Sequence, residues 1–178
     1  MNNDSTQPGY LIPTDTGPEY DEALEHQISR WICGVTGLAT DMVMPRWTEP
    51  QSQKGLTWCG FGLSVTPRDG TPATIQGDES SEQWTWEQVT VLSSFYGPSG
   101  AGMASRFREG IAVEQNAATL RSAAGLSLIE TGTISDLSRF IDNEWVRRYD
   151  ITTTLSRKNI RTYGVKSLVD GSISITGE

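Results

Sequence analysis

The sequence predicts an α+β fold, in which an antiparallel, twisted sheet carries two main helices on one face. Three observations lead to this prediction. Apolar residues recur at helical spacing between residues 24 and 35, residues 57–65 and 84–96 alternate with a period of two, and residues 145–156 alternate in the same way. The order of helix, strands, helix and strands lacks the regular strand–helix alternation of a parallel α/β sheet.

The first helix is predicted by a start signal, an apolar stripe and a stop signal. Thr16 and Glu19 have the spacing of a capping box, and Pro18 stands near the first helical position. Gly34 and Gly37 provide the stop. The stripe that should face the core consists of Leu24, Ile28, Trp31, Ile32 and Val35.

Two central strands follow. Residues 57–65 place Cys59, Phe61, Leu63 and Val65 on one side, and we expect this side to face the core and the strand to pair antiparallel with residues 84–96. Before them, residues 41–47 predict a short edge strand that ends near Pro45, because proline cannot donate to a strand ladder. Between them, residues 67–82 are typical of a long loop.

A second helix is predicted to begin after residues 97–100 and to continue to Gly125, with a kink near Gly110. A short apolar run at 126–129 and a loop at 131–138 follow. Residues 172–175 have the composition of a last short strand.

Residues 143–165 are about twice as long as a usual strand. Trp145, Tyr149, Ile151 and Leu155 share one side, and the other side is polar. We expect this strand to extend beyond its sheet, to turn within 155–163 and to form a long projecting β-hairpin. Such a strand would be shared with a neighbouring chain.

Length and charge limit the organisation and the partners. The 178 residues predict a flexible arm over 1–15 and a single domain over 16–178. A net charge of −8 argues against a broad basic surface that clamps DNA. The negative charge is compatible with a channel through which DNA slides without binding, because an acidic wall repels phosphates.

Cys33 and Cys59 predict buried free thiols, with a disulfide between them as the alternative. The amino terminus lacks the pattern of a secretory signal, and no apolar run reaches the length of a membrane span. We therefore expect a soluble protein of a reducing compartment that has no membrane partner.

The search for chemistry yields no catalytic, metal-binding or cofactor-binding residues. His26 is the only histidine and has no ligand pattern around it, and the nucleophile elbow, P-loop and Rossmann motifs are missing. The acidic residues near the start of the first helix complement its dipole. We expect a protein that is not an enzyme. A small enzyme or ligand-binding domain with 66–82 as a lid is the competing hypothesis.

Arginines next to aromatic residues are the candidates for a protein interface, since this composition is favoured at protein contacts. The alternative is that these arginines form ion pairs with Asp142, Glu144 or Asp150 within the chain. The candidate residues are Arg46, Trp47, Trp145, Arg147, Arg148 and Tyr149.

Several strings together are similar to a known family. They are Arg-Trp-Ile-Cys-Gly-Val-Thr-Gly-Leu at 30–38, Met-Val-Met-Pro-Arg-Trp at 42–47, Trp-Cys-Gly-Phe-Gly at 58–62, Ser-Phe-Tyr-Gly-Pro at 94–98, Gln-Asn at 115–116 and Trp-Val-Arg-Arg-Tyr-Asp at 145–150. The chain resembles the neck or tail-terminator family of tailed bacteriophages from about residue 20 to 170.

The resemblance implies a structural virion protein, assembled in the host cytoplasm as a homo-oligomeric ring, commonly a hexamer. Such a ring caps the tail tube, contacts the tail tube protein and the head connector or adaptor protein, and forms part of the DNA channel. The alternative within the same structure is another neck ring, such as an adaptor, a collar or a tail-completion protein.

Overall fold

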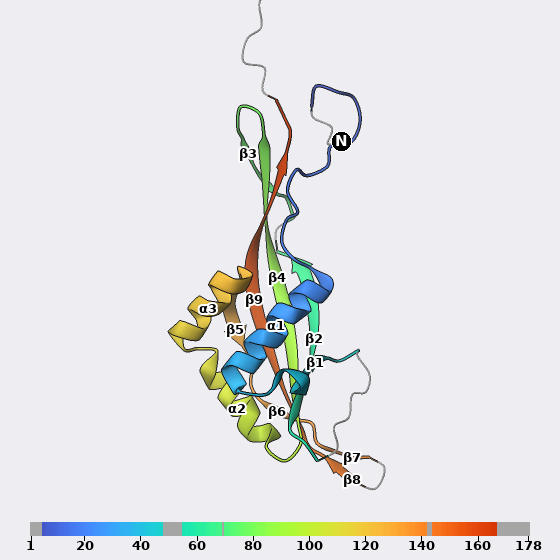
Figure 1. The fold of residues 1–178 in the computed structure, drawn as a ribbon, viewed down its shortest axis with the longest axis vertical. Coiled ribbons are helices and arrows are strands. Elements are labelled where there is room, and N and C mark those ends of the chain that lie inside the picture. Colours follow the sequence, from blue (N-terminus) through green and yellow to red (C-terminus); the bar gives the residue numbers. More distant parts are fainter. Residues whose placement is uncertain (1–4, 48–54, 69, 142–143, 167–178) are drawn as a thin grey trace, which may run out of the picture. The chain divides into compact units, whose positions relative to one another are not determined.

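The computed structural model describes residues 5–47, 55–68, 70–141 and 144–166. The chain divides into two compact units (Figure 1). Residues Glu19–Arg68 and Glu87–Arg157 form the helical unit, and Met1–Pro18, Asp69–Trp86 and Lys158–Glu178 form the strand unit. Strands β4 (Ser81–Tyr96) and β9 (Arg148–Tyr163) contribute residues to both units.

The helical unit contains all the α-helices of the described residues. They are α1 (Asp21–Thr36), α2 (Gly100–Gly110) and α3 (Glu114–Ala124), with a 3₁₀ turn η1 (Thr40–Met42). Its other strands are β1 (Val43–Pro45), β2 (Trp58–Pro67), β5 (Ser127–Thr131), β6 (Ser135–Asp136), β7 (Arg139–Ile141) and β8 (Glu144–Val146). The main sheet has the order β1-β2-β4-β9-β5, β6 pairs with β9, and β7 and β8 form a separate hairpin.

Helix α1 buries the predicted stripe and ends at the predicted stop. Leu24, Ile28 and Ile32 are almost completely buried, and Gly37 is left-handed with φ 78°. The predicted start is wrong, because the helix begins at Asp21 with Tyr20 as its N-cap residue. Gly17 has φ +64°, which is outside the right-handed helical region, so the capping-box residues precede the helix.

The predicted second helix is two helices. Helix α2 ends at Gly110 and α3 begins at Glu114. A Cβ atom at Gly110 would lie 2.5 Å from Val35 Cγ1, so α2 packs closely on α1 at this residue. Asn116 Nδ2 donates to the Gly110 carbonyl oxygen at 2.8 Å, which satisfies one of the carbonyls at the helix end. Because of this close packing and capping, the helix ends at Gly110, where the sequence predicted only a kink.

The central strands follow the prediction. Strands β2 and β4 pair antiparallel, with Cys59 opposite Phe95. Strand β1 ends at Pro45 and lies at the edge of the main sheet, although it pairs with β2 in parallel. The predicted core side of β2 is buried at Cys59 and Phe61.

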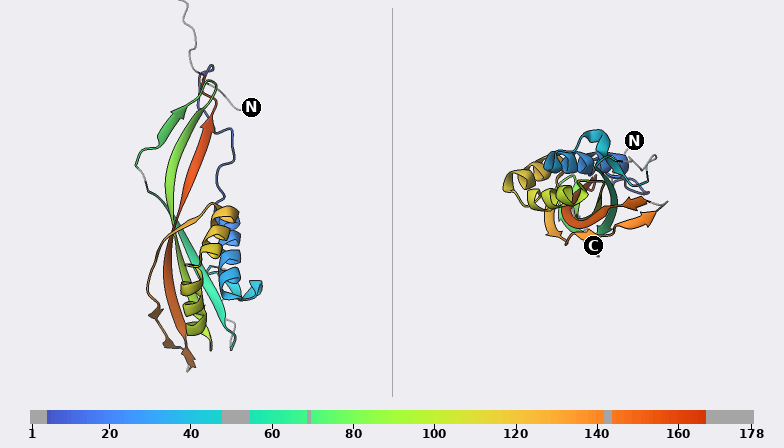
Figure 2. Two further views of the ribbon diagram at one scale, coloured as in Figure 1. Left: turned by 90° about the vertical axis from the view of Figure 1, so that its left-hand side faces the viewer. Right: turned by 90° about the horizontal axis from the view of Figure 1, so that it is seen from below.

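Helices cover one face of the sheet in the helical unit, as Figure 2 shows in its left-hand view. Phe107 of α2 lies 5.0 Å from Trp31 and 5.6 Å from Phe95, measured between ring centroids, so both helices and the sheet meet at this ring. Ile151 and Leu155 of β9 are fully buried beside them. This face supplies the hydrophobic core, whose burial drives folding.

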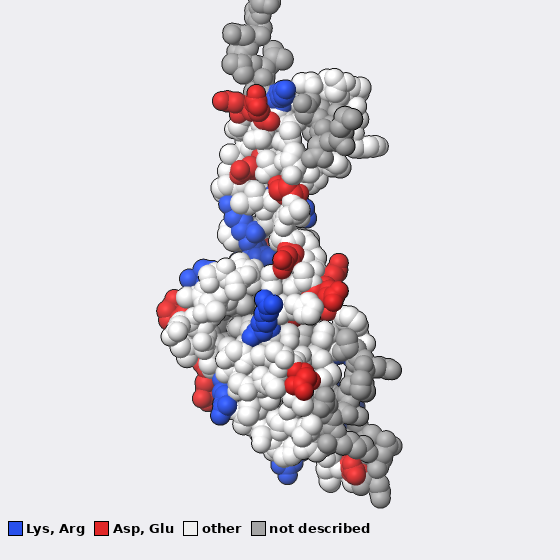
Figure 3. Space-filling model, viewed as in Figure 1, with Lys and Arg blue, Asp and Glu red and all other residues white. Residues whose placement is uncertain are grey.

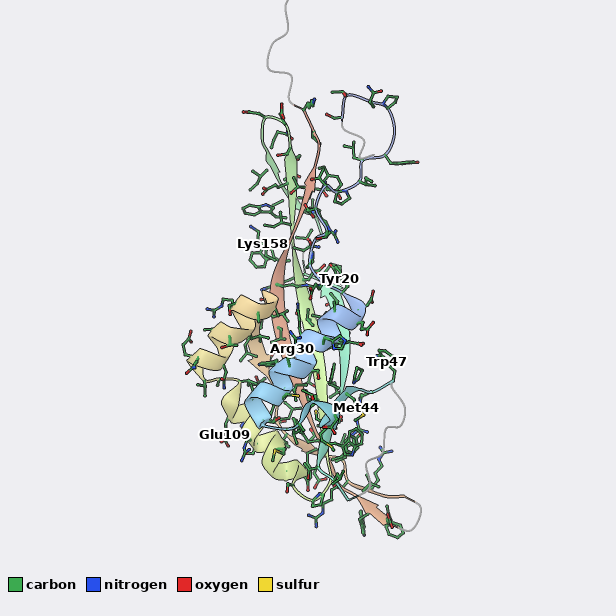
Figure 4. All side chains as sticks on the ribbon, viewed as in Figure 1. Tyr20, Arg30, Met44, Trp47, Glu109 and Lys158 are labelled. Atoms are coloured by element: carbon green, nitrogen blue, oxygen red, sulfur yellow. The ribbon has the colours of Figure 1, made fainter. Side chains whose placement is uncertain are left out.

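A buried ion pair fixes the start of α1 to the sheet. The Arg157 Nε donates to Glu87 Oε2 at 2.7 Å, and its Nη1 donates to the Glu19 carbonyl oxygen at 2.6 Å. The guanidinium lies 4.4 Å from the centre of the Tyr20 ring, and the Tyr20 hydroxyl donates to Glu87. Burial and the Glu87 charge raise the pKa of Tyr20. Figure 4 labels Tyr20 at this position.

The predicted turn within residues 155–163 is wrong. Strand β9 continues without a turn from Arg148 to Tyr163. It lies next to β4 on one side, and β5 and β6 pair with its residues 149–156 on the other. Trp145 belongs to β8, in the separate hairpin with β7. The α+β class, the mostly antiparallel sheet and the presence of a β-hairpin are confirmed.

The strand unit is built on β3 (Ala73–Gln76), which lies within the predicted 67–82 loop and forms a hairpin with β4. The Lys158 ammonium stands over the Trp84 ring, 2.7 Å from its centre. The Thr14 amide donates to the Thr162 carbonyl at 2.7 Å, so the amino-terminal segment hydrogen-bonds to β9. The division into an arm (1–15) and one domain (16–178) stays a prediction, and residues 172–175 lie outside the described residues.

Both cysteines are free thiols, as predicted, with Cys59 buried and Cys33 half-buried. Within the described part of the chain, no helix is long and apolar enough to cross a membrane. The same residues bring no group of three or more His, Cys, Asp or Glu side chains together in a way that could hold a metal ion.

Gly97 ends β4 in a conformation that other residues rarely adopt. Its φ is +90°, and a Cβ atom there would lie 2.1 Å from the Leu56 carbonyl oxygen. We predict that Gly97→Ala lowers the free energy of unfolding by more than about 1 kcal/mol, measured by urea denaturation. As a control, Gly102→Ala lies inside α2 with open space around it, and it should stabilise the chain by about 0.5–1 kcal/mol. Equal effects would contradict the prediction.

Removing one partner of the buried ion pair should cost more than removing both. Glu87→Gln leaves the Arg157 guanidinium buried without a counter-charge, and we expect a loss of about 3 kcal/mol in the free energy of unfolding. The double variant Glu87→Gln/Arg157→Met should recover part of this loss. A double variant that is less stable than Glu87→Gln would contradict the prediction.

Candidate protein–protein interface

All six residues predicted from sequence lie in the helical unit, but they fall into separate neighbourhoods. Arg46 and Arg148 meet on the sheet face opposite the helices, at Asp150. Trp145 lies in the β7–β8 hairpin. Trp47 contacts α1, Arg147 is exposed, and Tyr149 is half-buried against the hydrophobic core.

Asp150 holds the two arginines on the open face of the sheet. Arg148 donates to both carboxylate oxygens, from Nε at 2.8 Å and from Nη2 at 2.6 Å. Arg46 Nη2 lies 4.0 Å from Oδ2 and donates to the Ser94 hydroxyl at 2.8 Å. For Arg148 the predicted ion pair within the chain is therefore present. Arg46, directly after β1, links this end of the edge strand to β4 through Ser94 and to β9 through Asp150.

Two glycines make room for the Arg46 side chain. A Cβ atom at Gly62 would lie 3.5 Å from Arg46 Cδ, and one at Gly60 would lie 3.6 Å from Arg46 Cγ. These glycines alternate along β2 with the core residues Cys59 and Phe61, so they face away from the helices. The Arg46 stem therefore lies flat against β2, as long cationic side chains do on apolar surface.

The surroundings of Asp150 keep it charged. Burial disfavours its charge, but hydrogen bonds from Arg148 and Ser94 and the charges of Arg148 and Arg46 lower its pKa below the usual value. The same hydrogen bond to Asp150 raises the pKa of Arg148. Arg148 also stands 5.9 Å from the centre of the Tyr96 ring, which stacks on Trp58 at 4.2 Å.

The β7–β8 hairpin exposes a pair of aromatic rings. Phe140 and Trp145 stand opposite each other in the register, their ring centroids are 5.6 Å apart, and their exposed fractions are 57% and 71%. More exposed apolar side chains lie on the same segment. We call the exposed apolar residues of this segment the tip patch, which consists of Ile134, Leu137, Phe140, Trp145 and Val146. Phe140 and Trp145 share one face of the hairpin, and Val146 points to the other. The described neighbours leave these rings largely open to solvent.

Trp47 and Arg147 lie outside the Asp150 cluster, which consists of Arg46, Arg148 and Asp150. Trp47 is 67% exposed, and its Nε1 donates to Glu25 Oε1 of α1 at 2.9 Å. Figure 4 labels Trp47, which stands next to α1. Arg147 is exposed directly after the hairpin. The interface role of the six residues stays a prediction.

Sequence reasoning missed most of the tip patch, because residues 131–138 read as a polar loop. Ile134 and Leu137 are isolated apolar residues there, and a period-two pattern needs longer runs. The regular spacing of Ile134, Leu137 and Phe140, three residues apart, was the signal in the sequence that could have grouped them. Ser94 and Tyr96 were also missed as neighbours of Arg46 and Arg148, since strand pairing alone brings them together.

Charges on the surface are mixed. On the face shown in Figure 3, acidic and basic side chains of the described residues are interspersed, and the basic side chains do not form a continuous surface there. The exposed aromatic pair of the hairpin is of the kind enriched at protein interfaces.

The comparisons with known proteins identify the family. The family model described as phage neck terminator protein matches residues 22–178, nearly the whole sequence. The chain therefore belongs to the phage neck terminator protein family, and its role is structural, in the neck of the virion. The resemblance inferred from the sequence strings is thus confirmed. None of the curated proteins compared with the chain matches it.

The Asp150 cluster predicts a dependence of stability on pH. The pKa of Asp150 is lowered in the folded chain, so the unfolded chain binds more protons and stability rises with pH. The stabilisation is complete above the unfolded value of about 3.9 and is lost as the pH falls through the folded value. We expect Asp150→Asn to cost about 2 kcal/mol at pH 7 and less at pH 3, measured by urea denaturation.

Comparing the wild-type chain with Asp150→Asn isolates the effect of the Asp150 carboxyl group, because both proteins contain Asp15 and Asp136 with their lowered pKa values. An equal loss of stability at pH 7 and at pH 3 would contradict the role given to the Asp150 charge.

Proposed function

We propose that the chain forms a closed homo-oligomeric ring, a hexamer, which caps the tail tube and joins it to the head connector. The ring contacts the tail tube protein on one side and the connector or adaptor protein on the other. DNA passes through it without sequence-specific binding. The tip patch is the observation that carries this proposal, together with membership of the neck terminator family.

The tip patch has the composition of a protein contact. It contains two aromatic rings in contact, and Arg139 and Arg147 lie next to them in the sequence. Aromatic residues and arginine are enriched in interfaces, and clustered exposed apolar side chains mark them. A single chain leaves this surface in water, so burial against another copy is favourable.

The sheet edges support a contact through side chains rather than through added strands. Strand β1 has only three residues and ends at Pro45, and β5 contains an irregularity between Leu128 and Glu130. Short strands, proline and bulges at an edge all oppose pairing with another chain. Arg46 binds Ser94, Trp47 binds Glu25 of α1 and Tyr149 packs against the hydrophobic core, so we propose Trp145 and Arg147 as the direct contacts among the six predicted residues.

The net charge of −8 suits a channel for DNA, because a wall of mostly negative charge repels phosphates and leaves them mobile. The proposed role needs no cofactor, no metal and no catalytic residue. Assembly in the host cytoplasm fits two thiols that are free in the folded chain.

Removing the aromatic rings should disrupt the ring. We expect the purified chain to form one discrete oligomer in native mass spectrometry and ring-shaped particles in electron microscopy. Phe140→Ala/Trp145→Ala should shift the population to monomers with an unchanged melting temperature, because both side chains are exposed. Val113→Ala removes another exposed apolar side chain outside the patch and is the control.

Two outcomes together would overturn the proposed function. They are a chain that sediments only as a monomer, alone and with tail tube protein, and intact tails in a phage that lacks the gene.

A further inference from the structure

One edge of the sheet in the strand unit is formed by β3. Within the described ranges, β3 pairs with β4 alone, and β9 lies on the other side of β4 (Figure 1). Strand β3 contains no proline and no charged residue, and its four residues pair with β4 without a bulge. Prolines, charges and bulges are the features that keep an edge strand from pairing with another segment. This edge is therefore a site that can accept an additional strand.

One face of the same sheet carries exposed apolar side chains. Opposite positions in the register share a face, and so do alternate residues along a strand. Lys158 of β9, which Figure 4 labels, stands over Trp84 of β4 and so belongs to this face. Three of its large apolar side chains, Ile75, Trp86 and Ile160, are exposed. The apolar residues of the face are Ala73, Ile75, Trp84, Trp86 and Ile160.

Residues 172–176 have a pattern that matches this edge. Their sequence, Ser-Ile-Ser-Ile-Thr, alternates isoleucine with hydroxyl residues, as β3 alternates apolar with polar residues. A strand added to β3 with Ile173 beside Ile75 would extend the apolar face of the sheet. Its hydroxyl residues would then stand beside Thr74 on the other face, so like would meet like on both sides.

The described part of the chain ends next to β3. Gln76 Nε2 of β3 donates to the Val165 carbonyl oxygen at 3.2 Å, and the described residues end one position later. The connection over residues 167–171 can span up to about 20 Å, whereas neighbouring strands lie only about 4.8 Å apart. Its last two residues, Asp170 and Gly171, favour a turn. The segment that follows can therefore reach the edge of β3 in its own chain.

The other end of the chain covers the opposite edge of this sheet. The Thr14 amide donates to the Thr162 carbonyl of β9 at 2.7 Å, and the Thr162 amide donates to the Asp15 carboxylate. Alternate carbonyls of a strand point to the same side, so Thr162 points away from β4, as Thr152 does where it accepts from Gly132 after β5. The amino-terminal segment thus binds the β9 edge, and β3 is the edge left for the carboxyl-terminal segment.

We propose that residues 172–176 form a strand on the free edge of β3 in the same chain, antiparallel to β3 and with Ser174 opposite Thr74. The match to the family model extends through residue 178, so this segment belongs to the part of the chain that the family shares. Each end of the chain then covers one edge of the strand unit, and neighbouring chains meet this unit through side chains. The inference concerns a single chain and is independent of the proposed ring.

A pair of engineered cysteines tests this register. Residues opposite each other in antiparallel strands have Cα atoms about 4.5–5.5 Å apart, within the range of about 4.4–6.8 Å that a disulfide needs. We expect full-length Thr74→Cys/Ser174→Cys to form a disulfide within one chain under mild oxidation, detected by peptide mass spectrometry and non-reducing electrophoresis. Thr74→Cys/Ile173→Cys is the matched control. It should stay reduced, because Ile173 belongs to the other face.

Amide hydrogen exchange tests the strand itself. Ile173→Lys/Ile175→Lys puts charges on the apolar face, so the β3 amides should exchange about fivefold faster than in the wild-type chain. Ser172→Lys/Ser174→Lys adds the same charges on the polar face and should leave the exchange rate nearly unchanged. Equal rates in the isoleucine variant and the wild-type chain would overturn the inference. A disulfide between two chains, or protection of β3 that requires added tail tube protein, would also overturn it, because another chain would then be the occupant.

Discussion

The Asp150 carboxylate, buried between Arg148 and Arg46 on the open face of the sheet, is the interaction on which the arrangement of the interface depends. The helices bury one sheet face, and within the described residues no second layer of helices covers the other face. Arg148 begins β9 directly after the hairpin strand β8. Its bidentate bond to Asp150 fixes both side chains at the start of β9, and Arg46 links this pair to the end of the edge strand β1 and to Ser94 of β4.

The two faces of β9 show how one strand serves core and interface at once. Ile151 and Leu155 enter the hydrophobic core, while Asp150 lies on the opposite face with its arginines. A slip of one residue would exchange these faces and bury charge against Phe107 and Ile28. The register that forms the core thus also fixes the polar cluster and the position of the aromatic hairpin. Interface geometry is a consequence of core packing here.

Sequence patterns predicted the elements whose periodicity is long and regular. The stripe of α1 and the alternation in β2, β4 and β9 are such cases, because burial of one face enforces the pattern. The patterns failed where backbone conformation or pairing decides. The left-handed Gly17 places the start of α1 after the predicted capping box, and close packing at Gly110 divides the second helix. Residues 155–163 stay extended as part of β9, next to β4. The short strands β6 and β7 carry too few residues for a periodic signal, so most of the tip patch was missed.

The two free thiols bear on the life of the particle outside the cell. Burial raises the pKa of Cys59 far above its ordinary value and also raises that of Cys33. Thiolate is the form that reacts with oxidants and disulfides, and little of it is present at neutral pH in either residue. Both cysteines of this neck protein therefore react slowly with oxidants and with other thiols at neutral pH, so contacts at the phage neck that involve this chain are not readily cross-linked through them.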